Sequence, residues 1–140
     1  MLLWWIVGIA AIAICARIYA KGKSNPYKPD LTGKLILVSG GTAGIGKETA
    51  ATLYSLGADV IITGRDQQKG KDAAEEIKSR KIIDPAVKNS RLGLLEYMHL
   101  DMADINDIKR FAKEFLAKYP VIDILINNAG MINTDFERTK

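Results

Sequence analysis

A glycine-rich stretch, SGGTAGIGK at residues 39–47, carries the clearest chemical signal in the sequence. Its glycines allow a tight turn and let the backbone approach a pyrophosphate closely. An apolar run precedes the stretch and a helical pattern follows it. The free N–H groups at the start of that helix would therefore face the phosphates. This context favours nucleotide binding over a purely structural turn.

The same stretch nearly matches a second kind of nucleotide site. Gly41, Gly46 and Lys47 have the spacing of the phosphate loop of ATPases and GTPases. That motif requires Ser or Thr next, to hold magnesium, and this chain has Glu48. A carboxylate would add negative charge beside the phosphates. A phosphate-loop NTPase is therefore kept only as an alternative.

The elements that position this loop follow from apolar periodicity. Four short apolar runs, at residues 34–40, 59–63, 95–100 and 121–126, are predicted strands. Between them lie predicted helices at residues 45–56, 67–80 and 105–116, the last two capped by Asp66 and Asp104. The last helix has the clearest apolar face, formed by Ile105, Ile108, Phe111, Ala112, Phe115 and Leu116. This alternation predicts an α/β fold with a parallel sheet.

Three motifs, in order, resemble the short-chain dehydrogenase/reductase family. SGGTAGIG is similar to its TGxxxGxG loop, with Ser39 where Thr is usual. HLDM at residues 99–102 resembles the segment whose Asp contacts adenine, and residues 127–130 read NNAG, a signature of the family. The stretches GIGKETA, TGRD, FAKEF and INNAG look most like the retinol-dehydrogenase-like branch.

The resemblance implies half of a doubly wound Rossmann-type fold, with strand order 3-2-1-4, and a set of cofactor-binding residues. Gly40 to Gly46 would cradle the pyrophosphate, Asp101 would bind the adenine amino group, and the NNAG turn would line the cofactor. The candidate residues are Gly40, Gly41, Thr42, Ala43, Gly44, Ile45, Gly46, Arg65, Asp101, Met102, Asn128, Ala129 and Gly130.

The end of the second strand predicts which dinucleotide is bound. A carboxylate there would bind the ribose 2′-hydroxyl of NAD, whereas an Arg would accept the 2′-phosphate of NADP. Gly64 stands at the carboxylate position and Arg65 follows it, while Asp66 is assigned to capping the next helix. A guanidinium is well suited to phosphate. We therefore expect NADP in preference to NAD.

The residues that would perform the chemistry do not lie in this chain. In the family a Ser, a Tyr-x-x-x-Lys and an Asn follow the NNAG block, and only ten residues follow Gly130. Tyr19 and Lys23 have the right spacing but stand far from any cofactor. No catalytic residue is therefore assigned, and the chain as given is expected to have no turnover. The strand at residues 121–126 is expected at an open edge, available to a partner chain.

The first 20 residues predict a membrane anchor. All except Gly8 and Arg17 are hydrophobic, and residues 2–19 are long enough as a helix to span a bilayer. The cations that follow predict a body on the cytosolic side, with the endoplasmic reticulum favoured and a mitochondrial membrane second. Residues 21–33, rich in Pro and Gly, are a predicted linker, and the Rossmann half-domain is placed at residues 31–140.

Composition excludes several classes of protein. Four cations against Asp30 give residues 1–30 a net charge of +3, which leaves +1 of the total +4 for residues 31–140. A nearly neutral body argues against nucleic-acid binding. One cysteine and one histidine exclude a disulfide framework and a zinc site built from Cys or His.

These observations predict a membrane-anchored, NADP-dependent oxidoreductase that transfers hydride between the nicotinamide and a lipophilic alcohol or carbonyl, such as a retinoid, a steroid or a fatty carbonyl. The alternative from another class is a truncated subunit that holds the nucleotide, or is structural, in a membrane complex without catalysis.

Overall fold

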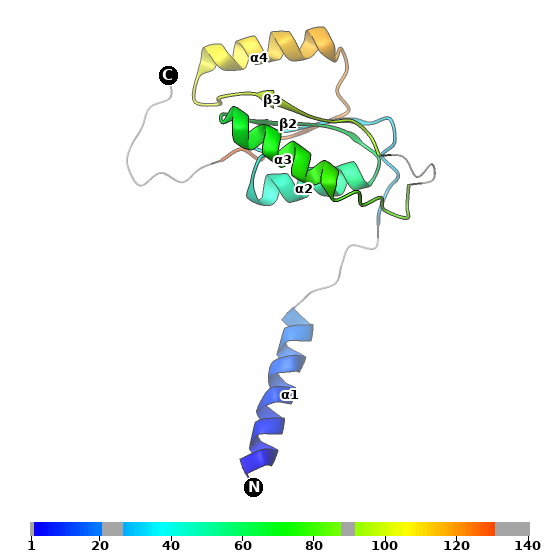
Figure 1. The fold of residues 1–140 in the computed structure, drawn as a ribbon, viewed down its shortest axis with the longest axis vertical. Helices are drawn as coiled ribbons and strands as arrows, with labels where there is room; N and C mark the ends of the chain where they lie inside the picture. The colour runs from blue at the N-terminus through cyan, green and yellow to red at the C-terminus, as the bar shows by residue number, and fades with distance from the viewer. Residues whose placement is uncertain (1, 21–26, 88–91, 131–140) are drawn as a thin grey trace.

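The computed structural model describes residues 2–20, 27–87 and 92–130. Residues 21–26 of the predicted linker, and the ten residues after Gly130, lie outside the described ranges. Figure 1 shows helix α1 apart from an α/β body. The elements are α1 (Leu2–Ala20), β1 (Leu35–Val38), α2 (Gly44–Ser55), β2 (Asp59–Gly64), α3 (Gln67–Ser79), β3 (Leu95–His99), α4 (Ile105–Lys118) and β4 (Ile124–Ile126).

The four strands form one parallel sheet in the order β3-β2-β1-β4, which confirms the predicted topology. β1 lies between β2 and β4, so that Ile36 is in register with Val60 on one side and Ile124 on the other. Because all strands run the same way, their carboxyl ends meet at one edge. The loop between β1 and α2 lies at that edge.

Alternating side chains of β1 and β2 build two cores. Ile36, Val38, Val60 and Ile62 pack against α2 and α3, whereas Leu37 and Ile61 face Phe111 and Phe115 of α4. Figure 1 shows α4 on one side of the sheet and the other two body helices on the opposite side. Burial on both faces explains why these strands read as continuous apolar runs.

The predicted helix boundaries are set by local polar groups. The Asp66 carboxylate accepts a hydrogen bond from Lys69 N at 3.0 Å, which confirms it as the N-cap of α3, and this bond lowers its pKa. Asp104 caps α4 in the same way, accepting from Asn106 N at 2.8 Å. Gly57, with φ of +88°, ends α2 as expected.

The fourth strand is shorter than predicted and begins at Ile124. The carboxylate of Asp123 accepts hydrogen bonds from Leu35 N and from Lys34 Nζ, both at 2.8 Å. The Asp123 side chain thus accepts a hydrogen bond from Leu35 N that a backbone carbonyl would accept if β4 were longer. The bond from Lys34 lowers the pKa of Asp123.

The apolar face of α4 is narrower than predicted. Phe111 and Phe115 are buried and Ile108 packs beside them, but Ile105 and Leu116 are 51% and 59% exposed, and Ala112 is exposed as well. Only a stripe with i, i+3 and i+7 spacing contacts the sheet. The predicted residues that flank this stripe are exposed to solvent.

The N-terminal segment is helical over Leu2–Ala20, and its described side chains are exposed. Within the described residues, no helix meets the length and apolarity needed to cross a membrane. The membrane-spanning part of the prediction is therefore not confirmed.

Close packing of α3 on β3 yields the first testable prediction. A Cβ on Gly70 would lie 2.1 Å from the ring of Tyr97, whose hydroxyl is held by the carbonyl of Gly64. Gly70→Ala should therefore lower the free energy of unfolding by about 1–3 kcal/mol, although Ala is the better helix former. Urea unfolding of the full-length protein measures the change.

Lys71→Ala, at the neighbouring exposed position of α3, is the control and should change stability by no more than about 0.5 kcal/mol. A Gly70→Ala variant as stable as the wild type would show that the Tyr97 ring can move aside without loss of stability.

Candidate cofactor-binding site

The glycine-rich loop is shaped by close backbone approaches. Gly40 has φ of +65°, and a Cβ there would lie 2.9 Å from Cα of Ala129. A Cβ on Gly46 would lie 2.4 Å from both Gly40 O and the side-chain nitrogen, Nδ2, of Asn128. Both positions therefore require glycine because the NNAG turn packs directly on the loop.

Ser39 joins the loop to the NNAG turn through its hydroxyl. The Ser39 oxygen accepts hydrogen bonds from Asn128 N and Ala129 N, both at 3.0 Å, and donates to Ile126 O at 3.3 Å. The Asn128 side chain donates back to Ser39 O at 3.1 Å and Gly40 O at 3.2 Å. The Asn128 amide is thus engaged with the loop backbone, while Ala129 and Gly130 are exposed.

The start of α2 has the properties of an anion-binding helix end. Its N-cap, Ala43, offers no side-chain hydrogen bond, so the first N–H groups are open to an external acceptor. Gly44, with φ of +55°, is exposed, and a Cβ there would meet no atom within 4 Å. Free donors and open space fit the phosphates of a dinucleotide.

Lys47 does not face this helix end. Its ammonium lies 2.8 and 3.0 Å from the carboxylate oxygens of Glu76 on α3. Arg80 also pairs with Glu48 and Glu76, which raises the pKa of its guanidinium. In this structure Lys47 therefore links two helices, unlike the lysine of a phosphate loop, which reaches the phosphates.

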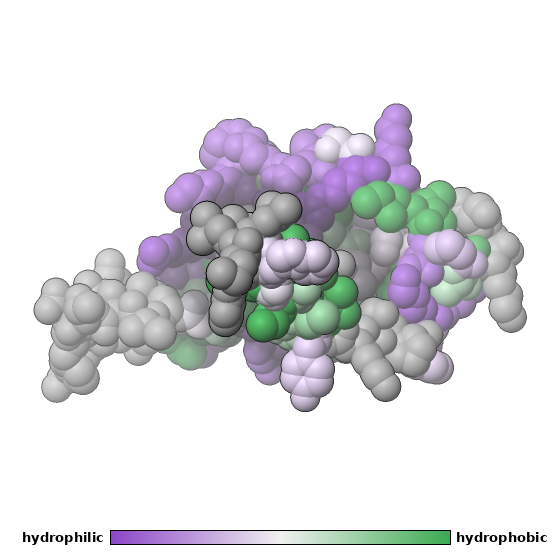
Figure 2. All heavy atoms as spheres, turned by 90° about the horizontal axis from the view of Figure 1, so that it is seen from below, coloured by the Kyte–Doolittle hydropathy of each residue, from purple (hydrophilic) through white to green (hydrophobic). Residues whose placement is uncertain are grey.

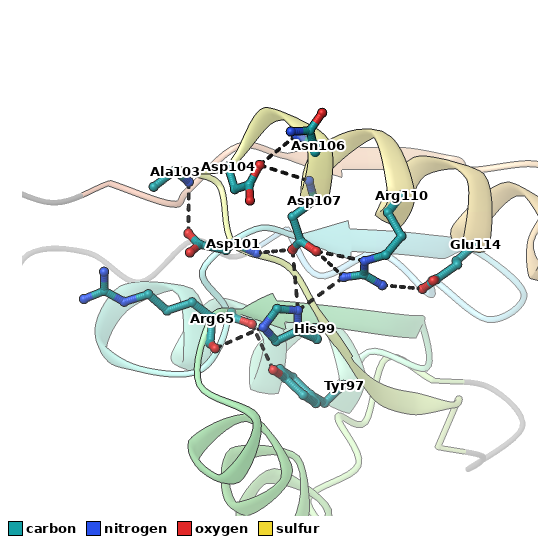
Figure 3. A network of polar contacts seen from close by, with 11 residues as sticks. Arg65, Tyr97, His99, Asp101, Ala103, Asp104, Asn106, Asp107, Arg110 and Glu114 are labelled. Atoms are coloured by element: carbon teal, nitrogen blue, oxygen red, sulfur yellow. Dashed lines mark hydrogen bonds and ion pairs between the residues drawn. The ribbon is translucent and has the colours of Figure 1, made fainter. Parts of the chain in front are cut away.

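The turn that carries Arg65 is held by two side chains of β3. The Tyr97 hydroxyl donates to Gly64 O at 2.9 Å, and His99 Nε2 lies 3.2 Å from Arg65 O (Figure 3). A Cβ on Gly64 would lie 2.8 Å from the Thr42 methyl group, so the loop itself occupies the space where a carboxylate would stand. The Arg65 side chain is exposed and points away from His99.

Asp101 lies in the loop between β3 and α4. Its Oδ1 accepts from Ala103 N at 3.0 Å, and its own N–H donates to Asp107 Oδ2 at 2.7 Å. This bond from Asp101, together with the one from Arg110, lowers the pKa of Asp107. The adjacent Met102 is 46% exposed.

The candidate residues thus follow β1, β2, β3 and β4 at one edge of the sheet, and direct contacts join the first and last groups. A hollow of about 850 Å³ runs along α2 from Gly44 to Leu53 and includes no candidate residue besides Gly44 and Ile45. It is open and does not mark the predicted site.

Sequence reasoning missed two residues, Ser39 as a junction and Asp107 as an acceptor for the Asp101 loop. The sequence marks Ser39 only as a replacement for Thr. Asp107 stands three residues after an N-cap, a position that indicates capping of its own helix. In the structure its carboxylate instead accepts from Asp101 N, outside the helix, and from Arg110.

Comparison with known proteins bears on this arrangement. Residues 34–140 match the family described as short chain dehydrogenase. The chain belongs to the short-chain dehydrogenase/reductase family. NAD(P) binding is typical of this family.

The short-chain dehydrogenase/reductase relatives include human retinol dehydrogenases. Retinol dehydrogenase 13 is 34% identical over 89% of this chain and 35% of its own length, and retinol dehydrogenase 12 is 42% identical over 78% and 32%. A solved metagenomic short-chain oxidoreductase in complex with NADP has 33% identity and a TM-score of 0.60, covering 73% of this chain and 41% of its own. The chain therefore spans about a third of the length of these curated relatives.

The Ser39 junction gives the second prediction. Ser39→Ala removes the acceptor shared by Asn128 N and Ala129 N, and only Asn128 N has another acceptor, Ile126 O. The free energy of unfolding should fall by about 1–2 kcal/mol. Urea unfolding of the full-length protein measures this loss.

Ser39→Thr keeps the hydroxyl and is the matched control. It should retain most of the stability that Ser39→Ala loses. Equal losses in the two variants would show that packing volume at residue 39, and not its hydrogen bonds, matters.

Proposed function

We propose that the full-length protein is an NADP-dependent oxidoreductase that transfers hydride between the nicotinamide and a lipophilic alcohol or carbonyl compound. The observation that carries the proposal is the junction of the glycine-rich loop and the NNAG turn beside the uncapped start of α2. Backbone N–H groups from Gly44 onward would hold the pyrophosphate. When bound, the cofactor supplies the hydride, and this chain's residues bind and orient it.

Preference for NADP rests on the turn after β2. Gly64 leaves no carboxylate to bind a free 2′-hydroxyl or repel a phosphate, and Arg65 is exposed with no ion pair to other described residues. A guanidinium in that state can bind a phosphate without first breaking another bond. The relative solved in complex with NADP supports the same choice.

Arg65→Ala tests the cofactor preference. It should weaken NADP binding by about 1.5–3 kcal/mol, the size of a hydrogen bond to a charged group, and leave NAD binding nearly unchanged. Isothermal titration of the full-length protein with each cofactor gives both values. Lys69→Ala, which removes an exposed cation on the adjacent helix, is the control. Equal losses of NADP and NAD affinity would contradict the assignment.

The substrate class is proposed from the relatives and from the apolar N-terminal helix. Retinol dehydrogenases are among the similar proteins, and a retinoid is one lipophilic substrate consistent with them. None of the described residues is assigned a catalytic role. A truncated, nucleotide-holding subunit is the alternative, and NADPH oxidation by the full-length protein with retinal would distinguish the two.

Further polypeptide is proposed to cover β4. This strand lies at the edge of the described sheet, with Ile124 and Leu125 40% and 54% exposed. An apolar edge of this kind favours pairing with another strand. The strand would come from the rest of the full-length protein or from a partner chain.

The N-terminal helix is proposed to attach the protein to a lipid bilayer. Ile9, Ile12 and Ile18 are each more than 60% exposed, and Figure 2, which looks along α1, shows apolar residues near the centre of the view and hydrophilic residues of the body above them. The full-length protein should stay in the membrane pellet after carbonate extraction, whereas a variant without residues 1–20 should be released. Release of both would contradict the attachment.

Intact microsomes, without carbonate treatment, test the proposed location. With the body on the cytosolic side of the endoplasmic reticulum, protease added to intact microsomes should digest it. Protection of the body would reverse the proposed orientation.

A further inference from the structure

Asp107 connects two segments around the proposed cofactor site: the Asp101 loop, which the family resemblance places at the adenine, and the turn of Arg65, which the proposed function places at the 2′-phosphate. Its side chain is 16% exposed. One carboxylate oxygen, Oδ2, accepts from Asp101 N at 2.7 Å, and the other, Oδ1, accepts from Arg110 Nε at 2.8 Å. Figure 3 shows this carboxylate between the Asp101 loop and the first turns of α4.

The first branch of these contacts, from Asp107 to the Asp101 loop, fixes Asp101. Its N–H is held by Asp107, and its Oδ1 is used by Ala103 N. The remaining oxygen, Oδ2, has no hydrogen bond to other residues in the described ranges. Asp101 therefore has one free acceptor on a backbone fixed from both sides, as recognition of an amino group requires.

The second branch reaches the Arg65 turn. The carbonyl of Arg65 can only accept, so His99 Nε2, at 3.2 Å, must donate to it. In neutral His99 this leaves Nδ1 as an acceptor for Arg110, whose guanidinium nitrogen lies 3.3 Å away. Arg110 in turn is bound to Asp107, and Asp107 Oδ2 also lies 3.5 Å from His99 Nδ1. One chain of contacts thus runs from Asp101 through α4 to the carbonyl of Arg65.

We propose that Asp107 is a positioning residue for cofactor recognition. It holds the Asp101 loop and the Arg65 turn at a fixed separation, so that the protein binds the adenine and the 2′-phosphate of one cofactor at the same time. This inference depends on the proposed NADP binding. Asp107 contacts no cofactor atom in this proposal and acts through Asp101 and through Arg110 with His99.

Asp107→Asn in the full-length protein tests the proposal. An amide has one acceptor oxygen, so its NH₂ group must face either Asp101 N–H or Arg110, and one contact is lost. The probes are NADP and its hypoxanthine analogue, in which the adenine amino group is replaced by oxygen. Affinity for NADP should fall about tenfold, a loss typical of a hydrogen bond to a charged group. The preference for NADP over the analogue should fall with it.

Asp104→Asn is the matched control, because it removes the same charge from the same helix and Asn is an equally good N-cap. It should keep the wild-type preference. Thermal unfolding verifies that each variant is folded. Should Asp107→Asn not fold, Arg110→Gln, at a half-exposed position, tests the second branch, and its preference for NADP over NAD should fall.

The outcomes separate the two proposals. A wild-type protein that does not bind NADP overturns the proposed function itself. A wild type that binds NADP and prefers it to the analogue, beside an Asp107→Asn variant with unchanged affinity and preference, overturns the positioning role. A variant that binds both nucleotides more weakly by the same factor also overturns it, because the effect would then be general. If the Arg110→Gln variant is used, an unchanged preference for NADP over NAD likewise overturns the positioning role.

Discussion

The structure depends on the direct packing of the loop after β1 against the turn after β4. Ser39 is 4% exposed, and its hydroxyl is bonded to three backbone groups of the opposite segment. The approach is so close that Gly40 and Gly46 cannot carry side chains. Strands distant in sequence are thereby joined at their carboxyl ends. Beside this junction the start of α2 has no side-chain cap, as the proposed binding of the pyrophosphate requires.

On the β3 side of the sheet, different contacts hold the turn after β2. Tyr97 of β3 packs against α3 and His99 contacts Arg110 of α4, and both reach the turn after β2. Gly70 lets α3 approach Tyr97, and Gly64 leaves room for Thr42. These contacts fix the backbone of Arg65 while its guanidinium stays exposed. A rigid backbone with a free charged side chain suits recognition of a phosphate that arrives from solvent.

Local patterns in the sequence were sufficient for the strands, their order through family resemblance, and the caps at Asp66 and Asp104. They were insufficient wherever a contact joins distant residues. Ser39 and Asn128 are separated by 89 positions, and no periodicity connects them. The spacing of Asp107 from Asp104 predicts a role in its own helix end, but its oxygen accepts from Asp101 N, six residues earlier. The exposure of Ile105 and Leu116 likewise depends on how far α4 overlaps the sheet, which apolar spacing does not encode.

The division of polar atoms between folding and recognition follows one rule across the site. Polar groups that hold the backbone in place already form internal hydrogen bonds, as do both hydrogens of the Asn128 side-chain amide and one oxygen of Asp101. Groups that would meet the cofactor have no internal partner among the described residues, as with the other oxygen of Asp101 and the guanidinium of Arg65. Binding would then require no internal bond to break, and little additional ordering of the backbone. Affinity for a dinucleotide would follow from contacts that already hold the sheet together.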